Sequence, residues 1–261
     1  MSSHTVPTAV EGVRLQRWLA DAGLCSRREG ETWIQAGRVS VNGVTVVQMG
    51  TRVTTSDQVA VDGLPIHKRW QPRRIILLHK PREVICTRRD PEGRRTIFDL
   101  LTGPVVPSRL VSVGRLDYAS EGVLLLSNDG ELANRLMHPK QQLARVYRAR
   151  IHGHLDSELL RRLQQEGVHL DDGTTGPLQI SIDQITGSNS WVTVTLHEGR
   201  NRLVRRIFES LDRPVSRLIR TSYGSIKLGE LPSGAWRFLA QDEIDHLRKL
   251  AGFNWRPVTQ R

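Results

Sequence analysis

The sequence is poor in cysteine and has no long apolar run. Cys25 and Cys86 are the only cysteines, and two distant thiols form neither a CxxC pair nor a disulfide framework, which indicates a reducing cytoplasm. No apolar stretch approaches the roughly 18 residues of a membrane-spanning helix. Residues 1–12 lack the basic start and apolar core of a signal peptide and are expected to be a disordered lead. We therefore expect a cytoplasmic protein with no membrane partner.

The sequence also lacks a metal-binding pattern. Its nine histidines include no HExxH motif. His152 and His154 could share one face of a strand, but two ligands without a third make a poor zinc site. We expect no metal.

Acidic residues are outnumbered, and the excess of positive charge is the main compositional signal. Lys and Arg outnumber Asp and Glu by 38 to 27, which gives a net charge of +11 over 261 residues. In a folded protein of this size such a charge indicates a polyanionic partner, nucleic acid or an anionic membrane. The missing spanning segment makes the membrane the weaker of the two. The length allows one large domain or a small one followed by a large one.

Residues 13–62 have the pattern of a small unit built from two helices and a hairpin. Apolar residues within 13–22 recur at helical spacing. Residues 26–29, Ser-Arg-Arg-Glu, have the spacing of a capping box and predict a second helix that ends near Gly37. Alternating valines flank an Asn-Gly pair in residues 38–46, the strongest short signal for a β-hairpin.

A further strand pair around Val53 and residues 59–61 is expected to complete this unit. Residues 63–74 mix Pro, Gly and basic residues without periodicity, which is typical of a linker. Five arginines gather at the junction of the two helices. A solvated polar face is the commoner fate of surface arginines, but acids are few here. The arginines are Arg14, Arg17, Arg27, Arg28 and Arg38.

The Ser-Arg-Arg-Glu junction and the Gly-Arg-Val-x-Val-Asn-Gly hairpin of residues 37–43 resemble the S4-type RNA-binding domain. The resemblance implies RNA binding through phosphate and shape contacts, with an affinity that depends on salt. It implies no chemistry.

Residues 75–251 alternate strand and helix patterns and are expected to form a second, larger domain, followed by a short tail at 252–261. The predicted strands are 75–78, 111–113, 123–126, 142–151, 178–182, 191–196, 225–228 and 236–239. The predicted helices contain residues 132–136, 156–165, 201–211 and 244–251.

Asp117 lies in a predicted turn between two strands, with Arg115 beside it. Such an acid could be a reactive group, but composition alone favours a turn residue, because Asp is a common turn former. Residues 198–211 carry an apolar stripe at helical spacing, which predicts core, and a stripe of arginines. The arginine stripe would normally be solvated. It matters only if it is directed at an anion, such as a phosphate or a catalytic carboxylate.

Four motifs in residues 75–250 resemble the catalytic domain of the RsuA/RluB-type ribosomal pseudouridine synthases. They are Gly-Arg-Leu-Asp-x-x-Ser-x-Gly-Val-Leu-Leu-Leu-Ser-Asn-Asp-Gly at 114–130, the strand around Tyr147, Glu-Gly-Arg-Asn-Arg-Leu-Val-Arg-Arg at 198–206, and Arg-Leu-Ile-Arg with Tyr-Gly at 217–224. The segments at 87–101 and 129–139 most resemble the RluB branch, which acts on large-subunit 23S rRNA. The resemblance implies an α+β fold with a mixed, mainly antiparallel sheet.

The same resemblance implies roles for individual residues. Asp117 matches the catalytic aspartate, Tyr147 the tyrosine that stacks on the base, and Arg205 the arginine paired with the aspartate. Leu116 and Leu218 would shape the pocket, and no cofactor is required. Further contacts with RNA are expected from Arg115, Arg200, Arg202 and Arg206.

The expected partner is ribosomal RNA, bound by a monomer. A 16S rather than a 23S rRNA enzyme, or a ribosome-assembly factor without activity, are the alternatives. A methyltransferase with an S4-type domain is the third, but it would need a Gly-rich nucleotide loop that the sequence lacks.

Overall fold

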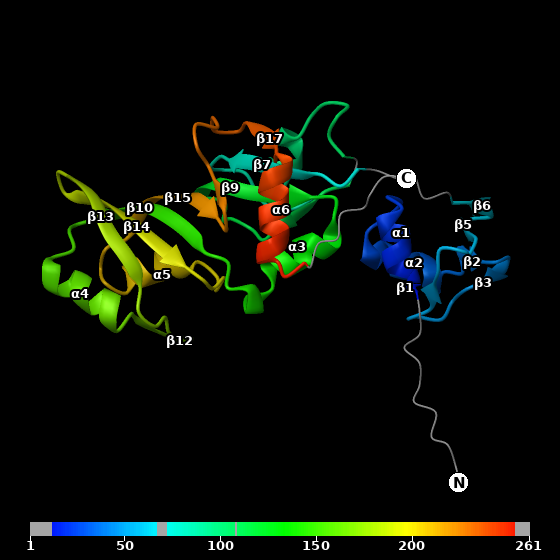
Figure 1. Ribbon diagram of the computed structural model, residues 1–261, viewed down its shortest axis with the longest axis horizontal. Coiled ribbons are helices and arrows are strands. Elements are labelled where there is room, and N and C mark those ends of the chain that lie inside the picture. Colours follow the sequence, from blue (N-terminus) through cyan, green and yellow to red (C-terminus); the bar gives the residue numbers. More distant parts are fainter. Residues whose placement is uncertain (1–11, 67–71, 108, 254–261) are drawn as a thin grey trace, which may run out of the picture. The chain divides into compact units, whose positions relative to one another are not determined.

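The computed structural model describes residues 12–66, 72–107 and 109–253, and the contacts divide the chain into two units, Met1–Pro72 and Arg73–Arg261 (Figure 1). Each unit has its own hydrophobic core. We describe the two units separately.

The first unit contains the two predicted helices, α1 (Leu15–Asp21) and α2 (Arg27–Gln35), packed beside small sheets. The capping box is present, because Ser26 Oγ accepts from the Glu29 amide at 3.1 Å and Glu29 Oε2 accepts from the Ser26 amide at 2.7 Å. The hairpin of β2 (Val39–Val41) and β3 (Val44–Thr45) is also confirmed. Its turn residues, Asn42 and Gly43, both have the positive φ that a two-residue hairpin requires.

The expected pairing of Val53 with residues 59–61 is wrong. Val53 belongs to β4 (Arg52–Val53), which pairs with β1 (Val13–Arg14), whereas β5 (Val59–Val61) lies between β2 and β6 (Leu64–Pro65). Strand β6 falls inside the segment predicted to be a linker. Two-residue strands leave no detectable periodicity, so the sequence could not assign their partners.

The second unit is built on one mixed sheet, as the expected α+β fold requires. Its path runs β13-β14-β10-β15-β9-β7-β17, with β8 beside β9 and β16 beside β15. Every pair is antiparallel except β15 with β9. The bounds are β7 (Ile75–Lys80), β8 (Val111–Val113), β9 (Ser120–Ser127), β10 (Arg145–His152), β13 (Gln179–Thr186), β14 (Asn189–Leu196), β15 (Val215–Tyr223), β16 (Ile226–Lys227) and β17 (Trp236–Phe238).

Helices cover the two halves of this sheet and form separate cores. Buried residues of α3 and α6 pack with β7, β8 and β9 in one core, and those of α4 and α5 pack with β10, β13 and β14 in another. Figure 1 shows α3 and α6 side by side, in agreement with their contacts. The remaining bounds are η1 (Ile97–Leu100), α3 (Gly130–Met137), η2 (Pro139–Gln141), α4 (Ser157–Gln165), β11 (His169–Leu170), β12 (Gly173–Thr174), α5 (Leu203–Glu209) and α6 (Gln241–Leu250).

The two halves meet where β9 runs parallel to β15, and this contact requires a glycine. Gly122 has a φ of +109°, and a Cβ atom built there would lie 2.2 Å from the carbonyl oxygen of Arg220. A larger residue would push the strands apart. The close approach brings the loop that enters β9 next to β15.

Two local predictions in this unit fail. Residues 215–223 were assigned no strand, yet β15 is the central strand of the sheet. The helix predicted over residues 201–211 begins only at Leu203, because Arg202, with a positive φ of 50°, occupies the position before α5 and makes no side-chain capping bond. Among the described residues, no helix has the length and apolar character needed to cross a membrane.

Candidate active site

A cavity of about 510 Å³ opens in the second unit where the β8–β9 loop, β10, β15 and the loop before α5 converge. Four residues expected to form a site lie together in its wall, namely Asp117, Tyr147, Leu116 and Leu218. Leu116 and Leu218 are buried. Arg115, Arg200 and Arg202 line the cavity too.

A buried lysine holds the loop that presents Asp117. Lys80, at the end of β7, is fully buried, and its Nζ donates to the carbonyl oxygens of Pro81 at 2.9 Å, Asp117 at 3.1 Å and Ser120 at 2.8 Å. All three N–H groups of the ammonium are thereby used. Burial lowers the pKa of Lys80 to about 8, against the opposing charges of Cys86, Asp117 and Glu121.

A cysteine and an arginine fix the same loop from other sides. Cys86 Sγ donates to the Leu116 carbonyl at 3.3 Å and accepts from the Leu116 amide at 3.4 Å. Burial raises the pKa of the Cys86 thiol, so the neutral form that donates is favoured. Arg205, buried on α5, donates from Nη2 to the Ala119 carbonyl at 3.0 Å.

The structure does not contain the expected direct ion pair between Arg205 and Asp117. The two terminal nitrogens of Arg205 are directed at the carbonyl oxygens of Val215 and Ala119, and its buried Nε has no hydrogen-bond partner among the described residues. Burial and the charge of Arg202 lower the pKa of Arg205, whereas the charge of Asp117 raises it. Arg205 therefore contacts the loop that carries Asp117 through the Ala119 carbonyl and not through the carboxylate.

Tyr147 stands at the junction of the two halves of the sheet. It is half-buried. Its ring packs against the core of the β10–β14 half and against a third core, which lies on the other face of β7 and β9. The packing holds the ring in place. Because Tyr147 also lines the cavity, part of the ring stays available for stacking.

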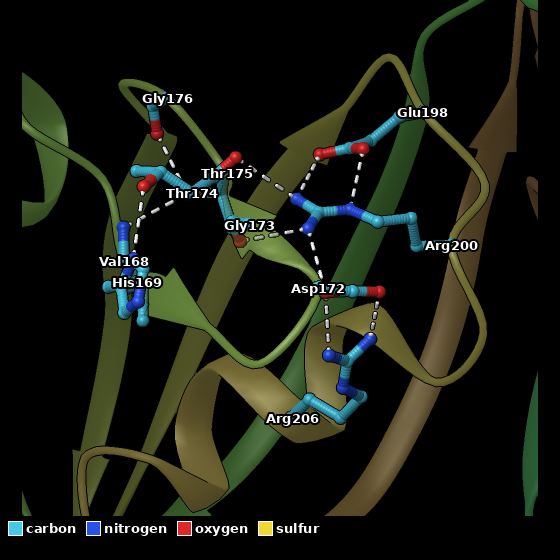
Figure 2. Close-up of polar contacts among 10 residues, drawn as sticks. All are labelled: Val168, His169, Asp172, Gly173, Thr174, Thr175, Gly176, Glu198, Arg200 and Arg206. Carbon is cyan, nitrogen blue, oxygen red and sulfur yellow. Dashed lines mark hydrogen bonds and ion pairs between the residues drawn. The ribbon is translucent and has the colours of Figure 1, made fainter.

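Two arginines expected to bind RNA, Arg200 and Arg206, take part in an internal network, which Figure 2 shows. Asp172, at the turn between β11 and β12, accepts from Arg206 at 2.7 and 2.8 Å and from Arg200 at 3.0 Å. Arg200 also pairs with Glu198 and donates to the Gly173 carbonyl at 3.0 Å. Arg200, which lines the cavity, uses Nε and both terminal nitrogens in these contacts, and Arg206 binds the same Asp172 from α5.

The hydrogen bonds and charges of this network lower the pKa of Asp172. Its hydrogen bonds with Arg206 come first among the causes that lower its pKa to about 2. Asp172 is exposed, so the network is open to solvent. Through Arg200 the network contacts residues 197–202, five of which line the cavity.

The arginines predicted to bind RNA in the first unit have different surroundings. Arg14, Arg27 and Arg28 are exposed. Arg38 forms a bidentate pair with Asp62 and lies over the ring of Trp33 at 4.8 Å, and the pair raises the pKa of its guanidinium. Arg17 pairs with Asp21 at 3.6 Å.

Sequence reasoning missed three residues of the site: Lys80, Asp172 and Arg220. Lys80 and Arg220 are charged residues buried in strands, and the sequence shows this pattern for Lys80, which follows the apolar run of residues 75–78 after one intervening residue. Buried charges of this kind often mark functional sites. Asp172 gave no such signal, because an Asp-Asp-Gly sequence is typical of an ordinary turn.

The arrangement suits a nucleic-acid substrate. The Asp117 carboxylate has no hydrogen-bond partner among the described residues and stands in a cavity lined by arginines and one tyrosine. In the described part of the chain no group of three or more His, Cys, Asp or Glu side chains could hold a metal ion. Fold and site together define an enzyme that would act on a nucleotide of an RNA chain.

Comparisons with known proteins identify the family. The profile of the RNA pseudouridylate synthases matches residues 74–210, and that of the S4 domain matches residues 13–59. The chain belongs to the RNA pseudouridylate synthase family and carries an S4 domain ahead of the catalytic part. The resemblances noted in the sequence are thereby confirmed.

Two relatives and one solved structure show how far the similarity extends. Ribosomal large subunit pseudouridine synthase B of Haemophilus influenzae is 46% identical over 248 residues, which cover 93% of this chain and 69% of that protein. The protein of the same name from Bacillus subtilis is 43% identical over 241 residues, 91% of this chain and 96% of the other. A pseudouridylate synthase of known crystal structure shares the fold, with a TM-score of 0.62, 24% identity and coverage of 90% of this chain and all of that one.

Proposed function

We propose that this enzyme converts uridine to pseudouridine in ribosomal RNA, with large-subunit 23S rRNA as the favoured substrate. The observation that carries the proposal is the open carboxylate of Asp117 in a basic cavity. The name shared by the relatives from Haemophilus influenzae and Bacillus subtilis supports the choice of large-subunit RNA. Action on rRNA would place the enzyme in the cytoplasm.

The reaction needs little besides these side chains. The C1′–N1 bond breaks, the uracil turns, and its C5 bonds to C1′ while the proton on C5 leaves and N1 gains one. No group is imported and no net oxidation occurs, so we propose that no cofactor takes part.

Asp117 is the proposed catalyst. Its carboxylate would either attack C1′ or take a proton from the ribose, and both roles need an ionised acid. The guanidinium of Arg205 lies close enough for its positive charge to interact with the negative charge of Asp117. The loop contacts of Lys80 and Arg205 would keep the carboxylate directed at the substrate.

Tyr147 and the arginines of the cavity wall would bind the RNA substrate. A uridine must leave its stack to reach the cavity, and the face of Tyr147 would hold it there. Arg115 and Arg202 are exposed and would contact the phosphates on either side. The first unit would add affinity through Arg14, Arg27 and Arg28.

Mapping pseudouridines in 23S and 16S rRNA from cells with and without this protein tests the substrate. One 23S pseudouridine should disappear without the protein and return when the wild-type chain is supplied. Loss of a 16S site instead would assign the enzyme to the small subunit. An unchanged map of both RNAs would contradict rRNA modification and favour a ribosome-assembly factor without activity.

A further inference from the structure

Arg220 is the buried charge that the proposed roles leave unexplained. It lies on β15, is 2% exposed and lines the cavity. Its Nε donates to the Val123 carbonyl of β9 at 2.7 Å. Neither terminal nitrogen has a hydrogen-bond partner among the described residues, and Nη2 is fully buried.

Comparison with neighbouring arginines shows that this state is unusual. Arg205, the other buried arginine, directs both terminal nitrogens at carbonyl oxygens. Arg217, on the same strand as Arg220, forms a bidentate pair with Glu121. No carboxylate within ion-pair distance faces Arg220 in the described part of the chain. Because a buried guanidinium without acceptors is costly, its donors are expected to serve a ligand.

The surroundings fix the direction of the side chain. Arg220 stands opposite Tyr147 in the register of β15 and β10, so both side chains leave the sheet on the same face. Its guanidinium lies over the ring of Tyr223 at 5.2 Å, and Tyr223 is held by a hydrogen bond from its hydroxyl to the Leu136 carbonyl. The free end of Arg220 is thus held rigidly beside the residue proposed to stack on the base.

The positive charge of Arg220 in the cavity wall suits an acceptor that gains negative charge. The charge of Arg220 helps to lower the pKa of Lys80, which shows that two buried cations lie close together. When the C1′–N1 bond breaks, its electron pair stays on the uracil and spreads to the two carbonyl oxygens. A preorganised guanidinium stabilises such a charge most in a site that excludes water.

We propose that the terminal nitrogen Nη1 of Arg220 donates to a carbonyl oxygen of the target uracil and holds the base while it turns. The inference rests on the proposed function. It makes Arg220 a residue that contacts the substrate, in addition to Asp117 and Tyr147.

The symmetry of uracil explains how one fixed donor can serve both substrate and product. Rotation by half a turn about the line through N3 and C6 exchanges N1 with C5 and exchanges the two carbonyl groups. The oxygen bound before the turn is replaced by the other one at the same place. A donor fixed to the sheet therefore meets an acceptor at both ends of the reaction, and C5 is left facing C1′.

Binding experiments with three RNAs test this inference. The full chain carrying Asp117→Asn, which prevents turnover, is combined with Arg220→Met and bound to one rRNA fragment containing the mapped site. The fragment carries uridine, pseudouridine or an abasic ribose at that position. The matched control is Arg150→Met, because Arg150 lies on β10, next to β15, and outside the cavity wall.

Arg220→Met should weaken binding of the uridine and pseudouridine RNAs by the same factor, about tenfold or more for the removal of a charged hydrogen bond. The abasic RNA should lose no affinity, and Arg150→Met should not distinguish the three. An equal loss on the abasic RNA would overturn the inference, since it would mean a contact with phosphate or ribose, or a structural role. No loss on any RNA would overturn it too.

Arg220→Lys keeps the inference falsifiable if the methionine variant does not fold. This variant retains the positive charge. Its loss of RNA affinity should be smaller than that of Arg220→Met and again confined to the RNAs that carry a base. An equal loss on all three RNAs would overturn the inference here as well. Failure of the proposed function looks different: Asp117→Asn alone would still form pseudouridine, or no rRNA site would depend on the protein.

Discussion

At the scale of single residues, a buried lysine decides where Asp117 stands. Lys80 connects the end of β7 to the carbonyl oxygens of Asp117 and Ser120. Its three hydrogen bonds need three N–H groups, which only the charged form has. The position of the loop that carries Asp117 is therefore tied to the protonation of Lys80.

This tie predicts that activity falls as pH rises through about 8, the pKa of Lys80. At that pH half of the amines are neutral and lose one of the three donors. The unfolding free energy should change in the opposite direction. Because the folded pKa lies below the ordinary 10.5, the folded state releases the proton first, and this group adds stability as pH rises from 8 to 10.5.

Rate profiles between pH 6 and 10 and urea unfolding of the wild-type chain and Lys80→Met check both effects. The stability difference between the two proteins should increase above pH 8. A rate that stays constant to pH 9.5 would show that the charge of Lys80 does not hold the loop.

Tyr147 allows a second test at this scale. If stacking is its main role, Tyr147→Phe should keep the rate within about twofold, whereas Tyr147→Leu should lose roughly tenfold or more, because stacking on an aromatic is worth about 1–3 kcal/mol per base. Single-turnover rates on the same rRNA fragment give the comparison. A loss with Tyr147→Phe as large as that with Tyr147→Leu would assign the role to the hydroxyl.

At the scale of elements, the β11–β12 hairpin acts as a clamp on the cavity wall. Asp172 binds Arg206 of α5 and Arg200 of the preceding loop. Asp172→Asn should loosen residues 197–202 and lower the rate of pseudouridine formation by roughly tenfold, as expected for misplaced substrate-binding groups. Asp171→Asn, its exposed neighbour, is the matched control and should retain the wild-type rate.

The pKa of Asp172 gives the same clamp a signature in acid. Since the folded pKa of about 2 lies below the ordinary 3.8, the stability from this carboxylate is complete above pH 3.8 and is lost as pH falls through 2. The difference in melting temperature between wild type and Asp172→Asn should shrink over that range. A difference that is independent of pH would show that the charge is not responsible.

Most elements could be predicted from the sequence, because strands such as β9 and helices such as α4 have one uninterrupted apolar pattern. Strand β15 could not, since it places arginines at positions 217 and 220, and Arg220 takes a buried position that the pattern would give to an apolar residue. Part of the candidate site could not be predicted for a similar reason. The motif around Asp117 pointed to the proposed catalyst, but Asp172, the partner of Arg200 and Arg206, lies in the turn of a short hairpin that has no pattern.

At the scale of the whole molecule, the two units divide the work. The S4 domain has exposed arginines, whereas the cavity with Asp117 lies in the second unit. Removing residues 1–62 should therefore weaken rRNA binding and make it less dependent on salt, by about 0.7–0.9 in the logarithmic slope for each phosphate that the S4 domain neutralises.

Titrations of the trimmed and complete proteins at several salt concentrations give the two slopes. The triple replacement of Arg14, Arg27 and Arg28 by Gln in the complete chain is the control for an effect of trimming itself. A slope that trimming leaves unchanged would exclude the S4 domain from RNA binding.

The most direct test of the whole account is tritium release from rRNA labelled at C5 of its uridines, because that hydrogen leaves only when C5 bonds to C1′. Asp117→Asn should bind this RNA and melt like the wild-type protein, yet release tritium at least about a hundredfold more slowly. Asp245→Asn, on α6 and outside the cavity wall, should release it at the wild-type rate. Release by Asp117→Asn within a few fold of wild type would contradict the central claim.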